Sequence, residues 1–383
     1  MKSAILTVFH VVLITALMNS TAFAQSNSDN AALADALKQV KKVQLQGVGH
    51  AKAVEAMKVL NSVSASEIPV LLEGLDGANP ISANWIRAAI QKAVAGSESL
   101  PADSIAAYFK DQSKNPQGRW LAWQIVCDCK SDFRDQTIDA LVTDPSMPLR
   151  AIGIAKLIDD AKAMGMDVEK MDSAAKDKKL AILKTALENA RDVKQISSIA
   201  KSMSPLGEEE VDLPKHLGLL PTWDLVAGFD NKEEAGFDVA YEPEQIAATL
   251  ELKEYKVGDE VFDWSKATTT EKSGAVDLNK VIGKKKGVIA YAATTFESSS
   301  ERDVEVRIGT PNAHKIWVNG ELVMSNEIYH NSNSIDKFTA PVKLKKGDNK
   351  ILVKLCQNEQ TQSWAQDWSF QFRFCDSTGK AVQ

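Results

Sequence analysis

The chain has few of the residues used most for covalent and metal chemistry: four cysteines and five histidines in 383 residues. A disulfide scaffold needs a denser cysteine framework, and a zinc site needs cysteine and histidine at ligand spacing, so both are excluded. Cys127 and Cys129 are predicted on one helix, where positions two residues apart point to different sides. Cys356 and Cys375 end two consecutive predicted strands, and in a hairpin they would lie at different heights. We therefore expect four free, buried thiols.

An excess of basic charge is also missing. The formal net charge is −6 and the pI is about 5.6. The lysines and arginines are spread along the chain, so the electrostatic footprint of nucleic-acid binding is absent and no nucleic-acid partner is expected.

Catalytic motifs are lacking as well. The sequence has no G-x-S-x-G, H-E-x-x-H, Walker or G-x-G-x-x-G pattern. Cys127 has no neighbouring histidine that would make it a nucleophile. A glycosidase needs two carboxylates that face each other, and Glu242 and Glu244 are only weak candidates. We therefore expect the protein not to be an enzyme and to need no cofactor.

The loops contain carboxylates and carbonyls that could bind calcium, but none has EF-hand spacing, so a structural calcium is left open.

Only one long apolar run is present, at residues 4–18. Lys2 precedes it and Ala22-Phe23-Ala24 follows it, a pattern typical of a secretory signal peptide over residues 1–24. The alternative, an uncleaved anchor, is disfavoured because the run is short and contains His10. The chain is therefore expected to be exported, periplasmic or extracellular, and free of the membrane after cleavage.

Residues 25–215 are predicted to be helical, with apolar residues at i, i+3 and i+4 and Pro-containing turns between the segments. Arg87, Arg119 and Arg150 each lie just inside a helix that follows such a turn, 32 and 31 residues apart. This period indicates stacked helix pairs, and an irregular helical bundle is the alternative. Each arginine is expected to pack its stem and bond a neighbouring turn through its head.

Proline and glycine interrupt the helical pattern between residues 202 and 231, which places a boundary near residue 215. From 216 to 383 the pattern is one of short strands, typical of a sandwich or barrel. Strands are predicted at 223–228, 251–255, 261–264, 275–278, 287–297, 302–309, 314–318, 321–324, 338–344, 349–357 and 369–375. Asn319-Gly320 predicts a type I′ hairpin, with Trp317 packed on the sheet.

Two resemblances follow from these residues. Residues 143–159, TDPSMPLRAIGIAKLID, resemble the inner helix of HEAT-like repeats, which implies a helical array that holds a protein partner. The series WDLVAGFDN, VRIGTPNAHKIWVNGELV, VKLKKGDNKILVKLCQN and FQFRF resembles the galactose-binding-like jelly rolls of exported bacterial proteins and glycoside hydrolases. The resemblance implies an all-α domain followed by a β-sandwich that binds sugars or serves as a spacer or docking surface.

Two loops, 326–336 and 358–370, have the composition of a sugar site: aromatic faces for the C–H faces of sugar rings, and amides and carboxylates for the hydroxyls. The alternative is that their aromatic residues fix the loops to the protein. Trp364 is expected to be exposed and Trp368 to be packed beside the strand. The candidate ligand-binding residues are Tyr329, His330, Asn331, Gln362, Trp364, Asp367 and Trp368.

The sequence thus favours an exported, non-catalytic binding or scaffold protein, with the helical repeats for a protein partner and the jelly roll for glycan or domain docking. A dedicated carbohydrate-binding accessory protein for polysaccharide is the main alternative. A hydrolase with an unrecognised site is a third.

Overall fold

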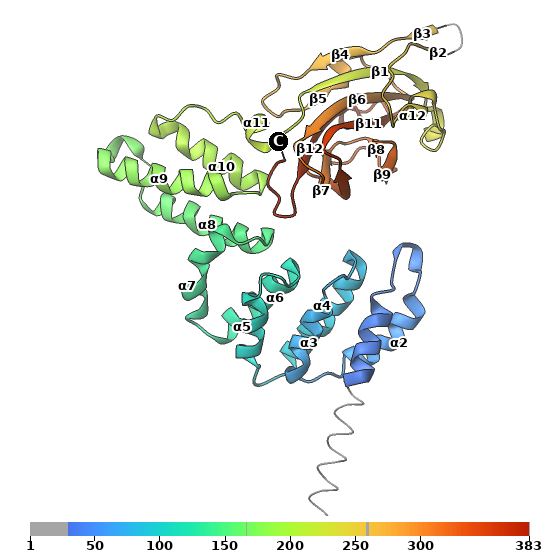
Figure 1. The fold of residues 1–383 in the computed structure, drawn as a ribbon. Coiled ribbons are helices and arrows are strands. Elements are labelled where there is room, and N and C mark those ends of the chain that lie inside the picture. Colours follow the sequence, from blue (N-terminus) through green and yellow to red (C-terminus); the bar gives the residue numbers. More distant parts are fainter. Residues whose placement is uncertain (1–29, 166, 258–259, 383) are drawn as a thin grey trace, which may run out of the picture. The chain divides into compact units, whose positions relative to one another are not determined.

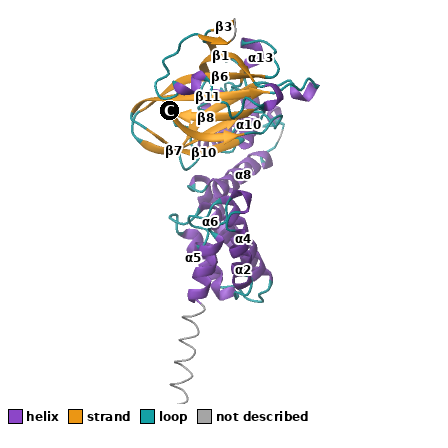
Figure 2. Ribbon diagram, turned by 90° about the vertical axis from the view of Figure 1, so that its right-hand side faces the viewer, coloured by secondary structure: helices purple, strands orange, loops and turns teal. Residues whose placement is uncertain are grey.

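The computed structural model describes residues 30–165, 167–257 and 260–382, so the predicted signal peptide lies outside the described residues. The chain forms two compact units, which divide between Lys156 and Leu157 (Figure 1). The described strands all belong to the second unit, while helices occur in both (Figure 2). Among the described residues, no helix is both long and apolar enough to cross a membrane.

The first unit is helical, starting with a helix over residues 30–40. Its further elements are η1 (Leu45–Gly47), α2 (His50–Leu60), η2 (Ala65–Glu67), α3 (Ile68–Glu73), α4 (Pro80–Ala95), α5 (Ala102–Lys110), α6 (Pro116–Cys129), α7 (Phe133–Thr137), η3 (Ile138–Thr143) and α8 (Met147–Ala163), the last of which runs across the division. One apolar core of alanine, leucine, isoleucine and aromatic side chains joins these helices.

Asparagine side chains link one helical turn to the next in the first unit. Asn79 caps α4 by accepting from the backbone N–H of Ile81, and its Nδ2 donates to the carbonyl of Val43 at 2.7 Å. Asn115 repeats the arrangement: it caps α6 and donates to the carbonyl of Leu75 at 3.2 Å. Each asparagine therefore starts its own helix and fixes the preceding turn.

Two of the three repeated arginines bond neighbouring turns, as predicted. The buried Arg119 places both terminal nitrogens 2.8 Å from the Asp144 carboxylate, and its Nε donates to the carbonyl of Phe109. The Nε of Arg150 donates to the carbonyl of Asp144 at 2.7 Å. Arg87 differs, because its buried Nε has no hydrogen-bond partner among the described residues.

The second unit combines helices with antiparallel sheets. Its helical elements are η4 (Val168–Lys170), α9 (Ser173–Asn189), α10 (Val193–Met203), η5 (Ser204–Leu206), α11 (Leu213–Leu217), η6 (Lys232–Glu234), α12 (Glu242–Gln245), α13 (Leu278–Val281) and η7 (Ser363–Ala365). Its strands are β1 (Thr222–Asp230), β2 (Tyr255–Val257), β3 (Glu260–Phe262), β4 (Ser265–Thr268), β5 (Val276–Asp277), β6 (Val288–Ser298), β7 (Arg302–Gly309), β8 (Ala313–Val318), β9 (Glu321–Asn326), β10 (Phe338–Leu344), β11 (Gly347–Gln357) and β12 (Ser369–Cys375).

The described strands form a sheet in the order β4-β1-β6-β11-β8-β9, a second sheet in the order β10-β7-β12-β5, and the small pair β2-β3. Side chains of both larger sheets share one core, in which Trp223 of β1 contacts Phe370 and Phe372 of β12 edge-on. A second apolar cluster holds Val226, Phe229 and Tyr291 together with Tyr255 and Phe237 from the chain between β1 and β4.

The hairpin prediction is confirmed. Asn319 and Gly320 have φ of 53° and 87° and join β8 to β9. The Asn319 side chain also accepts from the backbone N–H of Lys350 at 3.0 Å, which ties the turn to β11. Trp317 is buried in the sheet, as expected.

All four cysteines are free, as predicted, but they are not all buried. Cys129 is exposed, because it is the last residue of α6 and that end of the helix faces solvent. Cys356 and Cys375 are buried and lie on strands of different sheets, so β11 and β12 do not form a hairpin with each other.

Candidate functional site

The two loops that the sequence singles out meet around one exposed tryptophan. Trp364 lies in η7, and 61% of its surface is exposed. Its ring is contacted edge-on by the imidazole of His330, with 5.1 Å between the ring centres. His330 comes from the other loop and adopts a left-handed φ of 54°. The contact orients the indole while leaving much of it open to solvent.

A buried asparagine holds the histidine in place. His330 Nε2 lies 2.7 Å from Asn358 Oδ1, and Asn358 Nδ2 donates to Glu234 Oε1 at 2.9 Å. Asn358 directly follows β11, whereas Glu234 ends η6, so the chain of contacts joins three segments distant in sequence.

These contacts border a polar cleft of about 350 Å³. It is lined by Glu233, Glu234, Asn358, Glu359 and Gln360. Glu359 Oε2 accepts from the backbone N–H of Glu233 at 2.9 Å, which connects the two walls of the cleft. We call Trp364, His330 and these lining residues the rim.

Asn231, two residues before Glu233, has no exposed surface. Its Nδ2 is 3.2 Å from both the hydroxyl of Tyr329 and the carbonyl of Gln357. Its Oδ1 has no hydrogen-bond partner among the described residues. Burial raises the pKa of Tyr329 well above its usual value, so this hydroxyl stays protonated and its role here is structural.

Trp368 is the clearest departure from the predicted site. Its side chain is fully buried in the core between the two larger sheets, as the strand position next to β12 dictates, and no ligand can reach it. Its Nε1 has no hydrogen-bond partner among the described residues.

The remaining predicted residues lie in the same two loops as the rim tryptophan and histidine, and two of them, Asn331 and Asp367, make hydrogen bonds that hold these loops. The Asn331 side chain accepts from the backbone N–H of Ser332, and Gln362, which directly precedes η7, has an exposed side chain. The backbone carbonyl of Asp367 accepts a hydrogen bond from the Asn312 side chain. Asp367 itself is exposed, and its carboxylate takes no part in that bond.

None of the five residues that line the cleft was a predicted site residue, although Asn358, Glu359 and Gln360 lie in the predicted loop 358–370. Glu233 and Glu234 lie more than 120 residues from Asn358 and Glu359 in the chain, so local composition cannot bring them together. The one available signal for the two glutamates was the turn Asn231-Lys232-Glu233-Glu234, which begins three residues after the end of the predicted strand 223–228.

Of the two weak carboxylate candidates, Glu244 has a structural role. Glu244 Oε1 accepts from the fully buried Lys354 Nζ at 2.9 Å and from the hydroxyl of Tyr291 at 2.6 Å. Lys354 also donates to the carbonyls of Phe237 and Val239, so its charge is satisfied. This network fixes the chain between β1 and β4 on the sheet. Glu242 is exposed and lies outside the network.

The buried thiols are equally unsuited to chemistry. Burial raises the pKa of Cys356 to about 12 and that of Cys375 to about 11, so both stay protonated at neutral pH. Within the described ranges, no group of three histidine, cysteine, aspartate or glutamate side chains could hold a metal ion.

Comparison with known proteins gives little. No family model and no curated protein matches the chain. Solved structures match weakly. A β-glucosidase from Kluyveromyces marxianus in complex with glucose is 15% identical, with a TM-score of 0.26, over 42% of this chain and 17% of the enzyme. A β-glucuronidase from an uncultured Clostridium sp. is 11% identical, with a TM-score of 0.22, over 40% of this chain and 28% of the enzyme. This chain therefore spans less than a third of either enzyme, and the likeness carries no argument about function.

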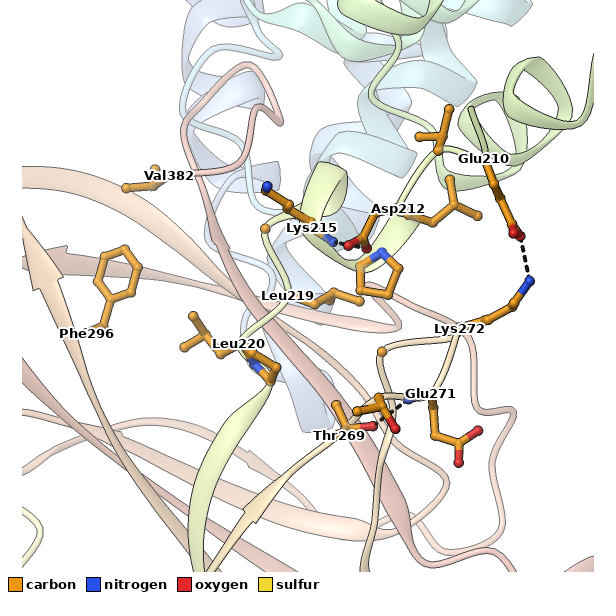
Figure 3. Close-up of a pocket in the computed structure, with 17 residues that line it drawn as sticks. Glu210, Asp212, Lys215, Leu219, Leu220, Thr269, Glu271, Lys272, Phe296 and Val382 are labelled. Atoms are coloured by element: carbon orange, nitrogen blue, oxygen red, sulfur yellow. Dashed lines mark hydrogen bonds and ion pairs between the residues drawn. The ribbon is translucent and has the colours of Figure 1, made fainter. Parts of the chain in front are cut away.

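A larger cavity, of about 960 Å³, lies between residues 210–221 and the turn 269–274 of the second unit (Figure 3). Leu219 and Leu220 contribute to its apolar lining, and their backbone N–H groups are bonded to carbonyls of Pro214 and Phe372. Glu210 and Lys272 form an ion pair of 2.7 Å across it. None of the predicted site residues lines this cavity, and it lacks the exposed aromatic face of the rim.

Proposed function

We propose that this protein is an exported, non-catalytic glycan-binding protein whose rim is the binding site. The observation that carries the proposal is Trp364: a large aromatic face that is 61% exposed, oriented by His330, next to a cleft of amide and carboxylate side chains. Exposed indoles stack on the C–H faces of sugar rings. Carboxylates accept hydrogen bonds from the sugar hydroxyls, and amides both accept and donate them.

The second unit is proposed to be a galactose-binding-like jelly roll. Two antiparallel sheets with a common core and the Asn319-Gly320 hairpin support this fold. In this reading the rim lies on loops that a rigid framework positions, which is the usual arrangement for binding residues.

The first unit is proposed to be a HEAT-like array that holds a protein partner. The repeated asparagine caps at Asn79 and Asn115 and the arginine contacts at Arg119 and Arg150 support a stacked repeat. Export through the predicted signal peptide completes the proposal.

The lack of catalysis is supported by the state of the candidate groups. Glu244 is bonded to Lys354 and Tyr291, and the two buried thiols are protonated.

Affinity electrophoresis of the full-length protein in gels that contain soluble polysaccharides tests the proposal. We expect retardation by at least one polysaccharide, and a loss of affinity of about tenfold or more in Trp364→Ala. Val261→Ala, another exposed apolar residue of the second unit, is the matched control and should be retarded like the natural protein. Retardation that Trp364→Ala leaves unchanged, or no retardation by any polysaccharide from protein shown to be folded, would refute the proposal.

A further inference from the structure

We propose that the large cavity of the second unit binds a small aliphatic carboxylic acid, with the hydrocarbon chain on the apolar floor of the cavity and the carboxylate on Lys215. This site is separate from the rim, and the inference does not depend on glycan binding.

The cavity has the size of a ligand site. Its volume of about 960 Å³ lies at the upper end of the roughly 300 to 1,000 Å³ that small-molecule pockets occupy. Protein interiors are close-packed and rarely leave voids larger than a water molecule. A hollow of this size next to a core therefore points to an occupant.

The floor of the cavity is apolar. Phe296 and Val382 are buried members of the core that the two larger sheets share, and Leu220 packs against the same core. Leu219 is also buried. A hydrocarbon chain on these side chains would extend the core, and the hydrophobic effect favours the removal of its surface from water.

Backbone groups of the two walls are already hydrogen-bonded within the chain. The N–H of Leu220 donates to the carbonyl of Phe372 at 2.9 Å, and the N–H of Thr269 donates to the carbonyl of Pro221 at 2.9 Å. A hydrocarbon chain can therefore lie on these walls without leaving those donors unpaired, which is the usual cost of covering backbone with an apolar group.

All three carboxylates that line the cavity are engaged by groups of the chain itself. Glu210 pairs with Lys272 at 2.7 Å, and Glu271 pairs with Lys280. Asp212 caps α11, because its Oδ1 accepts from a backbone N–H at 3.1 Å. These carboxylates are thus committed to the protein.

Lys215 differs from the other charged residues of the lining. Among the described residues, no carboxylate lies within ion-pair distance of its ammonium group. In Figure 3 its side chain points toward the side of Val382, away from the ion pair of Glu210 and Lys272. A cation without a partner beside an apolar floor fits a ligand with a carboxylate at one end and hydrocarbon at the other.

The two parts of such a ligand have separable effects on affinity. Each methylene that is buried raises an affinity by about fourfold, so two more methylenes raise it by about fifteenfold. One pair of unit charges about 4 Å apart in water changes an affinity by about fivefold. Chain length should therefore dominate, and the charge of the head group should set the preference among ligands of equal length.

The test is isothermal titration of the full-length protein with hexanoate, octanoate and decanoate, and with 1-octanol and octylamine. Affinity should rise about tenfold or more at each step from hexanoate to decanoate. Octanoate should bind about fivefold more tightly than octanol, and octylamine should bind most weakly of the three eight-carbon ligands.

Two variants with matched controls place the site. Thr270→Trp puts an indole at an exposed lining position and should weaken decanoate binding about tenfold or more, whereas Thr339→Trp, at an exposed position outside the cavity, should not. Lys215→Gln should bring octanoate and octanol to within about twofold of each other. Lys346→Gln removes an exposed ammonium outside the cavity and should keep their difference.

Three results would overturn the proposal: affinity that does not rise with chain length, octylamine bound as tightly as octanoate, or decanoate binding that Thr270→Trp leaves unchanged. Photolabelling with a diazirine derivative of decanoate needs no variant. The label should fall within residues 210–221 or 269–274, and labelling confined to other segments would also overturn the proposal. Trp364→Ala should bind decanoate like the natural protein, so a failure of glycan binding leaves this site standing.

Discussion

Two tryptophans four residues apart, Trp364 and Trp368, have opposite environments in the structure. The sequence predicts this difference, because Trp368 adjoins a strand and Trp364 lies in the preceding loop. Local position cannot predict that His330 contacts Trp364 or that Glu233 and Glu234 reach the same cleft, since those contacts depend on the packing of distant loops. Of the seven rim residues, only Trp364 and His330 were predicted, and the acidic wall was not.

His314 predicts a pH dependence of stability. Its ring is fully buried, Nδ1 lies 3.0 Å from the carbonyl of Asn312, and Nε2 lies 3.2 Å from the Asn326 amide. Burial lowers its pKa from 6.5 to about 4. The unfolded chain therefore binds a proton that the folded chain does not between those values, so the stabilisation is fully present above about pH 6.5 and is lost as the pH falls toward 4.

The measurement is urea unfolding at pH 7 and pH 4.5, compared with His314→Gln. This histidine should account for a loss of about 2 to 3 kcal/mol in the free energy of unfolding, and the variant should lose correspondingly less on acidification. Identical pH dependence of the two proteins would contradict this account of His314.

The cysteines predict a labelling pattern. Cys129 is exposed, whereas Cys356 and Cys375 are buried and have raised pKa values. Iodoacetamide at pH 8, followed by peptide mass spectrometry, should modify Cys129 first and leave Cys356 and Cys375 unmodified until urea unfolds the protein. Rapid labelling of Cys356 in the native protein would show that its sheet opens easily.

Among the elements, hairpins and long strands were predicted better than short ones. β7, β10 and β12 have their predicted bounds, because alternation and turn residues define them. The predicted strand at 251–255 is absent except for Tyr255, and β4 (Ser265–Thr268) was missed. β4 consists of polar and small residues and is held by pairing with the edge of β1, which local sequence does not encode.

The contact between Arg119 and Asp144 predicts a large effect of one substitution on the first unit. Asp144→Ala leaves the buried guanidinium of Arg119 without its partner and removes an acceptor for the backbone N–H of Ser146. We expect the free energy of unfolding to fall by about 3 to 5 kcal/mol. Chemical unfolding followed by circular dichroism measures it.

Asp139→Ala is the control, because its ion pair with Lys156 is solvent-exposed and should contribute less than about 1 kcal/mol. Equal effects of the two substitutions would mean that the contact between Arg119 and Asp144 is not the specific link proposed for the repeat.

On the scale of the whole molecule, the change from helix to strand and the division into compact units fall at different places. The predicted boundary near residue 215 is close to the end of α11 at Leu217, yet α9, α10 and α11 belong to the same compact unit as the sheets. One reason is Arg373 of β12, whose Nη1 donates to the carbonyl of Leu217 at 2.9 Å. Sequence composition indicates where helices give way to strands, but it does not indicate that a side chain of β12 bonds the end of α11.

Two fragments of the chain test whether the helices after Lys156 belong to the same compact unit as the sheets. Residues 157–383 should melt at a clearly higher temperature than residues 216–383. The shorter fragment lacks α9, α10 and the link between them, from which Ala190, Arg191 and Ile196 line a small pocket together with Arg373 and Ala381. Differential scanning calorimetry compares the two. Equal melting temperatures would mean that these helices add nothing to the stability of the sheets.

The central claim is that Trp364 contacts a glycan. The most direct measurement is the ¹⁵N–¹H spectrum of the tryptophan indoles in the full-length protein, with the Trp364 signal assigned by Trp364→Phe, during titration with the tightest-binding oligosaccharide. The account predicts a saturable shift of the Trp364 signal, while the signals of the buried Trp223 and Trp368 stay in place. A saturable shift of other indoles with Trp364 unmoved would contradict it and place the binding site outside the rim.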